Sequence, residues 1–130
     1  MKRQHVFGGG RFEKIGSYSR VLRIGSFVFV AGTTAVEPTG KLHAPYDSYA
    51  QTIYILDRIE KALMDVGATR KHVVRTTVFL SDMKEASGFV KAHGEFFDGI
   101  YPVSTAVEAG LTTPGMLVEI AVDAIIADEV

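Results

Sequence analysis

Residues 117–126 read LVEIAVDAII, and this stretch decides the fold class. β-Branched and aliphatic residues predominate in it, which favours a strand. Because successive side chains of a strand point to opposite faces, every second residue from Val118 to Ile126 lies on one apolar face. The other face carries Glu119 and Asp123. A carboxylate among apolar neighbours is costly unless it is paired, solvated or used in chemistry, so Glu119 is the first candidate for a catalytic residue.

The rest of the chain alternates short apolar runs with two amphipathic segments. We expect a short strand before residues 8–10, strands over 18–24 and 27–31, a helix over 48–66, a strand over 73–80, a helix over 86–97 and a strand over 103–109. The first helix would begin at a capping box of Ser48 and Gln51. Runs of strands with two separated helices indicate an α+β fold, in which one mixed sheet carries both helices on one face. We expect one domain of residues 1–130.

That arrangement leaves the second face of the sheet uncovered. The uncovered face would hold Glu119 and Asp123, together with Ser104, Ala106 and Glu108 if these have the same alternation phase. A small sheet with one open, half-apolar face usually associates with further copies of itself. The sequence therefore predicts a homo-oligomer with sites near the subunit contacts.

Composition excludes several classes of function. The chain of 130 residues is 47% hydrophobic and 22% charged, has a formal charge of −1 and contains no cysteine. Thiol catalysis, disulfides and thiolate metal sites are therefore excluded. Balanced charge without Lys/Arg runs argues against a nucleic-acid surface. We find no signal peptide and no apolar run of about 20 residues that could span a membrane, so we expect a cytoplasmic protein.

Other polar residues give weaker signals. The histidines are His5, His43, His72 and His93. None of them is spaced as a metal ligand, so we expect no metal. His93 lies on the apolar stripe of the second predicted helix, as a core residue or as a member of the site. Tyr18 and Arg20 would share a strand face, where they could hold a small anion or form a solvated edge pair.

Several stretches, taken in order, point to a family. They are IGSYSR (15–20), FVAG (29–32), VVRTTVFLSD (73–82), PVSTAVE (102–108) and VEI (118–120). In these stretches, and over essentially its whole length, the chain resembles the RidA family, which is also called YjgF or endoribonuclease L-PSP. The resemblance implies a chorismate-mutase-like fold and a homotrimer with three clefts between subunits. The deaminase branch of that family hydrolyses reactive enamines and imines there without a cofactor.

The resemblance also assigns roles to individual residues. The family's water-activating glutamate falls on Glu119, which the strand pattern had already singled out. The family's site tyrosine falls on Tyr18, and its Ser-Gly pair falls on Ala31 and Gly32. A helix position that is often asparagine falls on Lys91.

The chain departs from the family pattern at one position of consequence. The arginine that binds the substrate carboxylate in the deaminases falls on Ser104, which has neither the charge nor the forked donor of a guanidinium. Efficient deamination of 2-imino acids would then need another cation. The possible replacements are Arg20, Lys91 and Arg75. Thr105 and Ala106 follow Ser104 and would line the ligand with it.

Three functions remain open at this level. The first is a cofactor-free hydrolase or deaminase, in which Glu119 handles the proton or the water on a small imine, enamine or related carbonyl compound. The second is a trimer that binds a small-molecule metabolite without turnover, which the lost arginine favours about equally. The third, an endoribonuclease or translation inhibitor, is disfavoured by the balanced charge.

Overall fold

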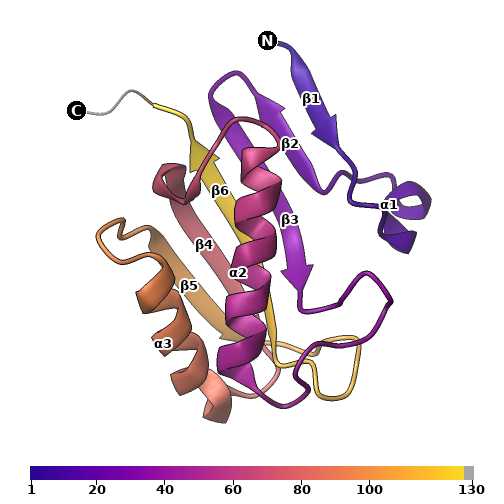
Figure 1. Cartoon of the computed structure of the whole chain (residues 1–130), viewed down its shortest axis with the longest axis vertical. Helices are drawn as coiled ribbons and strands as arrows, with labels where there is room; N and C mark the ends of the chain where they lie inside the picture. The colour runs from indigo at the N-terminus through magenta and orange to yellow at the C-terminus, as the bar shows by residue number, and fades with distance from the viewer. Residues whose placement is uncertain (128–130) are drawn as a thin grey trace.

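The computed structural model describes residues 1–127, except for the side chain of Arg11. Residues 128–130 of the predicted domain lie outside the described residues. The elements in chain order are β1 (Arg3–Val6), α1 (Arg11–Gly16), β2 (Val21–Ile24), β3 (Phe27–Thr34), α2 (Ser48–Met64), η1 (Arg70–His72), β4 (Val73–Leu80), η2 (Met83–Glu85), α3 (Ala86–Phe96), β5 (Val103–Glu108) and β6 (Val118–Ile125) (Figure 1).

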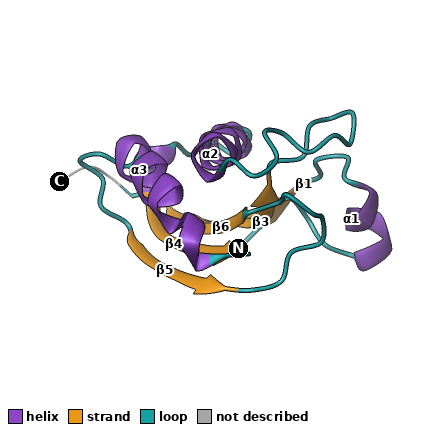
Figure 2. Ribbon diagram, turned by 90° about the horizontal axis from the view of Figure 1, so that it is seen from below, coloured by secondary structure: helices purple, strands orange, loops and turns teal. Residues whose placement is uncertain are grey.

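The strands form one six-stranded mixed sheet in the order β1-β2-β3-β6-β4-β5. Strands β4 and β5 are parallel, and every other neighbouring pair is antiparallel. Helices α2 and α3 lie side by side on one face of this sheet (Figure 2). The predicted α+β class and the two helices on one face are thus confirmed.

The core lies between β6 and α2. Val118, Ile120, Val122 and Ala124 are at most 1% exposed, which confirms the alternation expected for this strand. They form one cluster with the buried aliphatic side chains of α2, among them Leu56. The last strand in the sequence therefore occupies the middle of the sheet, where its apolar face is covered.

Helix α1 was not predicted, because six residues are too few to show a helical period. Its Glu13 is buried and accepts hydrogen bonds from the backbone N–H groups of Gly8 (2.8 Å) and Gly10 (3.2 Å). The strand predicted from Tyr18 is wrong at its start, since β2 begins at Val21. Tyr18 and Arg20 therefore lie in the connection between α1 and β2 and not on a shared strand face.

The predicted capping box at the start of α2 is also wrong. Asp47 is the N-cap and accepts from the Ala50 N–H, while Gln51 is fully buried. The amide of Gln51 donates to the carbonyls of Ala44 (3.0 Å) and Gly115 (2.8 Å). Its Oε1 accepts from the Leu117 N–H at 2.9 Å. This one side chain joins α2 to the loop that leads into β6.

Helix α3 presents a histidine to the core. The ring of His93 packs against Phe89 and Phe97, with centroid distances of 5.3 and 4.7 Å. Its Nε2 lies 2.9 Å from the Thr76 hydroxyl. Burial lowers the pKa of His93 below the ordinary value of 6.5, because a low-dielectric environment disfavours the imidazolium.

Replacing Gln51 with leucine should lower the free energy of unfolding by roughly 1–3 kcal/mol, because the buried Leu117 N–H loses its acceptor and the carbonyls of Ala44 and Gly115 each lose one of two donors. Urea denaturation measures the change. The matched control is Thr52→Val, at the adjacent buried residue, whose hydroxyl bonds only to the Ser48 carbonyl within the same helix. Equal effects of the two changes would contradict the linking role of Gln51.

The lowered pKa of His93 makes stability depend on pH in a defined direction. Well above pH 6.5 the ring is neutral in both states and contributes no pH dependence. As the pH falls through that value, the unfolded chain takes up the proton first, so the native state loses stability. The free energy of unfolding should therefore fall more steeply for the wild type than for His93→Phe between about pH 7 and 5. Parallel curves would show that the ring is not held neutral.

Candidate functional site

Glu119 lies on β6 between Thr34 of β3 and Phe79 of β4. Its side chain is partly buried and points to the face of the sheet that the helices leave open. The carboxylate lies over Gly32, where a Cβ atom would come within 2.5 Å of Oε2. Glycine at position 32 therefore provides the space in which the carboxylate rests.

The Glu119 carboxylate makes no hydrogen bond or ion pair with any residue between 1 and 127. Asp123, four residues along the same face, differs in this respect. Its Oδ2 lies 4.0 Å from Nη1 of Arg75 on the neighbouring strand. An unpartnered, partly desolvated carboxylate can accept a proton or hydrogen-bond a ligand, so Glu119 is the stronger candidate for chemistry.

The strand beside Glu119 is irregular. The pairing of β3 with β6 shifts register between Val30 and Thr33, which places Ala31 and Gly32 in a bulge. Bulges re-aim side chains and backbone groups and are common next to active sites. Ala31 and Gly32, two of the predicted site residues, thus lie directly beside the predicted glutamate.

Arg20, the first cation considered as a replacement for the family's arginine, lies elsewhere. Its Nη1 donates to the Gly32 carbonyl (2.9 Å) and to the Thr33 hydroxyl (3.1 Å), and its Nε lies 3.6 Å from Glu13. Thr33 is buried on the helix-covered face, opposite to Glu119. Arg20 therefore stabilises the bulge from the helix-covered side of the sheet, and it does not face the Glu119 carboxylate of its own chain.

Ser104 does not share the open face with Glu119, and neither do Ala106 and Glu108. Parallel pairing sets Ser104 beside Thr76, whose hydroxyl donates to Ser104 Oγ at 2.7 Å on the helix side. The expected alternation phase is therefore wrong for β5. Thr105, which pairs with Thr77, is the member of the predicted set that faces the same way as Glu119.

The strand pairings also place Ser104 and Glu119 far apart along the sheet. Ser104 lies opposite Thr76, while Glu119 lies opposite Phe79, two strands away from β5 and three residues further along. At about 4.8 Å between strands and 3.3 Å per residue, their Cα atoms are about 14 Å apart. One small molecule cannot contact both residues within a single chain.

The remaining predicted residues are dispersed. Lys91 is exposed on α3, with its Nζ 4.8 Å from the centre of the Tyr49 ring of α2, on the far side of the sheet from Glu119. Tyr18 is 41% exposed in the connection before β2. Arg75 faces the open side, where it pairs with Asp123. Within one chain, the structure brings together Glu119, Ala31 and Gly32 and leaves the others apart.

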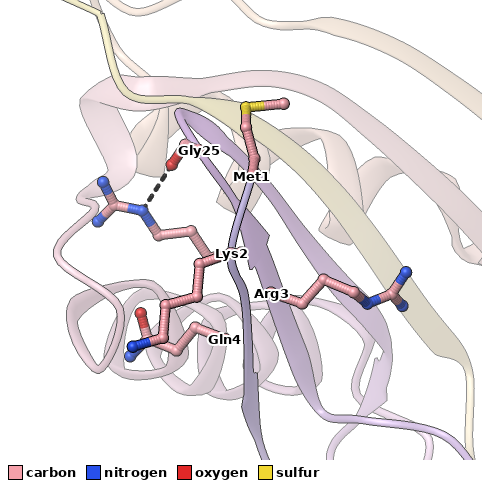
Figure 3. A pocket seen from close by; sticks show the side chains of 6 residues that line it. Met1, Lys2, Arg3, Gln4 and Gly25 are labelled. Atoms are coloured by element: carbon pink, nitrogen blue, oxygen red, sulfur yellow. Dashed lines mark hydrogen bonds between the residues drawn. The ribbon is translucent and has the colours of Figure 1, made fainter.

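Two hollows on the surface of residues 1–127 lie away from these residues. A groove of about 580 Å³ runs beside β1, lined by Met1, Lys2, Arg3, Gln4, Arg23 and Gly25, with Arg23 bonded to the Gly25 carbonyl at 2.8 Å (Figure 3). A second hollow of about 530 Å³ lies between Arg70 and Ile100. The face around Glu119 is open in a single chain, so a cleft there needs walls from another molecule.

One set of polar contacts was missed by sequence reasoning. His93, Thr76 and Ser104 form a continuous hydrogen-bonded chain from α3 through β4 to β5. No pattern within a single element predicts it, because the contact depends on the parallel pairing of β4 with β5. Among residues 1–127, no helix is long and apolar enough to cross a membrane, and no three His, Asp or Glu side chains gather as metal ligands.

Comparison with known proteins identifies the family of this fold. The family model described as endoribonuclease L-PSP matches residues 9–126. A RutC family protein of Pyrococcus abyssi is 30% identical over 120 residues, covering 92% of this chain and 94% of that protein.

Two solved structures show the same architecture. Rv2704 of Mycobacterium tuberculosis, described as a member of the YjgF/YER057c/UK114 family, is 40% identical with a TM-score of 0.86, covering 96% of this chain and 100% of that one. The Rid-family protein YyfA of Yersinia pestis is 28% identical with a TM-score of 0.83, over 96% and 100% of the two chains. The fold is therefore of the chorismate-mutase-like kind expected, and the chain belongs to the RidA/YjgF family, whose model bears the name endoribonuclease L-PSP.

Proposed function

We propose that this protein is a homotrimer that holds a small imine, enamine or related carbonyl metabolite in clefts between adjacent subunits. Glu119 is the catalytic residue of the proposed site, and no cofactor takes part. Ala31, Gly32, Thr105, Ser104 and Ala106 line it, the last two from the neighbouring copy, and Tyr18 and Lys91 lie further from the reacting atoms.

The observation that carries this proposal is the carboxylate of Glu119. It is partly buried, it lies over Gly32 beside a bulge, and it has no partner among residues 1–127. A structural carboxylate in a sheet is normally paired or fully solvated. An unpartnered one, on a strand whose other carboxylate is paired with Arg75, is a typical feature of a functional site.

Exposed apolar side chains on the open face support the proposal that a second copy of the chain forms a wall of the cleft. Phe27 and Phe29 of β3 are 45% and 43% exposed, and Val103 and Val107 of β5 are 63% and 44% exposed. These side chains form two exposed apolar groups at opposite sides of the open face, separated by β6 and β4 with the Arg75–Asp123 pair. Exposed apolar groups on an uncovered sheet face are typical of association surfaces. The separation of Ser104 from Glu119 also supports a second copy, because a site that contains both residues must take one from each of two chains.

Hydrolysis of an imine needs only groups that a site of this kind supplies. Glu119 accepts a proton from water as the water oxygen adds to the imine carbon, and it passes this proton to the nitrogen, which gives a carbinolamine. Glu119 then takes the proton of the carbinolamine hydroxyl and gives it to the nitrogen as the C–N bond breaks. Ammonia leaves, the carbonyl product forms and Glu119 is again ionised. The net change is imine plus water to carbonyl plus ammonia, with no oxidation or reduction.

Binding without turnover is the second candidate function. It is favoured by Ser104, since an arginine–carboxylate pair contributes about 1.5–3 kcal/mol while a neutral hydroxyl contributes about 0.5–1.5 kcal/mol. Neither Arg20 nor Lys91 compensates within one chain, because both lie on the helix side of the sheet. A metabolite held weakly in this way could be sequestered or sensed.

Glu119→Gln should abolish hydrolysis of a small imine generated in situ, either iminopropionate or its uncharged amide, while the oligomer and the fold persist. The amide keeps the size of the side chain but cannot accept a proton from water. Ammonia release above the spontaneous rate measures activity, and light scattering measures the assembly. Asp123→Asn is the matched control, because it alters a carboxylate on the same strand face that is paired with Arg75.

The outcomes separate the candidate functions. Activity unchanged in Glu119→Gln would contradict a catalytic Glu119. A wild-type rate equal to the spontaneous rate, with a metabolite still bound, would support the binding function in place of catalysis. RNA cleavage that persists through purification and is lost in Glu119→Gln would support the endoribonuclease name instead.

A further inference from the structure

The chain of His93, Thr76 and Ser104 runs from the core to the surface. His93 Nε2 lies 2.9 Å from Thr76 Oγ1, and Thr76 Oγ1 lies 2.7 Å from Ser104 Oγ. Thr76 is fully buried, whereas Ser104 is exposed on the edge strand β5. A buried polar connection therefore ends in an accessible hydroxyl.

The geometry of the Thr76–Ser104 contact makes Thr76 the donor, and counting protons then fixes the direction of the hydrogen bond between Thr76 and His93. The single hydroxyl proton of Thr76 is donated to Ser104. The second contact of Thr76 must then be accepted from His93, which requires a proton on Nε2. His93 is neutral in its apolar setting, since burial lowers its pKa, and a neutral ring with Nε2–H satisfies this requirement.

The consequence lies at Ser104. Its oxygen accepts from Thr76, and its own proton has no acceptor among residues 1–127. The lone pair used by Thr76 restricts where that proton can point, so Ser104 is oriented as a donor toward the surface. A hydrogen-bonded hydroxyl chain also polarises its last member and strengthens it as a donor.

We propose that His93 and Thr76 are positioning residues that orient the Ser104 hydroxyl as a neutral hydrogen-bond donor, and that this donor binds the carbonyl oxygen of a small uncharged ligand. The inference rests on the proposed function, because Ser104 belongs to the same cleft. It narrows the ligand class to amides, ketones and similar neutral carbonyl compounds.

Charge explains the preference for an uncharged ligand. A carboxylate that enters a cleft must lose water, which needs a charged or multiple donor in return. Ser104 offers one neutral donor. Arg75, which lies one residue earlier in the pairing of β4 with β5, faces the opposite side of the sheet and is paired with Asp123.

The test compares two probes of nearly equal shape, pyruvamide and pyruvate, by protein-observed NMR titration of the full-length protein. Wild type should bind pyruvamide about tenfold more tightly than pyruvate. Thr76→Val, His93→Phe and Ser104→Ala should each weaken pyruvamide binding by about two- to twelvefold, the range of one neutral hydrogen bond. Thr76→Ser should restore binding, because it returns the hydroxyl.

A matched control and a structural readout accompany the titrations. Thr52→Val removes an equally buried threonine hydroxyl that has no connection to Ser104, and it should leave pyruvamide binding unchanged. Long-range ¹H–¹⁵N correlations should show the Nε2–H form of His93 in the wild type. This readout does not depend on whether Thr76→Val folds.

Three results would overturn the inference while leaving the proposed function standing. The first is the Nδ1–H form of His93, and the second is pyruvamide binding that is equal in the wild type, His93→Phe and Ser104→Ala. The third is pyruvate bound more tightly than pyruvamide. If the wild type binds neither probe, and the NMR signals of Glu119 and its neighbours do not shift, the proposed function itself would be overturned.

Discussion

The alternation of side chains along β6 is the constraint on which the rest of the structure depends. Because β6 lies between β3 and β4, its residues on one face must be apolar to pack under α2. The intervening residues then point to the uncovered face, whatever their polarity. Glu119 reaches that face at the bulge of β3, where Gly32 leaves room for its carboxylate.

Much of this arrangement follows from the sequence, because it rests on local alternation. The apolar face of β6, the helices α2 and α3 and the choice of Glu119 needed only periodicity and the cost of a buried charge. The predicted strands over 18–24 and 27–31 are joined at Gly25, whose φ of 59° is one that glycine adopts freely. Family resemblance supplied the overall topology, which no local pattern encodes.

The errors have a common physical cause, which is dependence on pairing between distant segments. The phase of Ser104 is set by parallel pairing of β5 with β4, and a shift of one residue moves a side chain to the other face. Gln51 does not form the expected capping box, because its amide is hydrogen-bonded to the backbone of Ala44, Gly115 and Leu117. Arg20 donates to the Gly32 carbonyl because it lies in the connection before β2, which the strand pattern did not predict.

The proposed site places Glu119 in a crevice shared by two copies of the chain. The most direct measurement is a crystal structure of the protein soaked with a small carbonyl compound. We expect a ring of three chains, with the compound hydrogen-bonded to the Glu119 carboxylate of one chain and contacted by β5 of the next. A monomer, or a Glu119 side chain in bulk solvent away from any second chain, would contradict it.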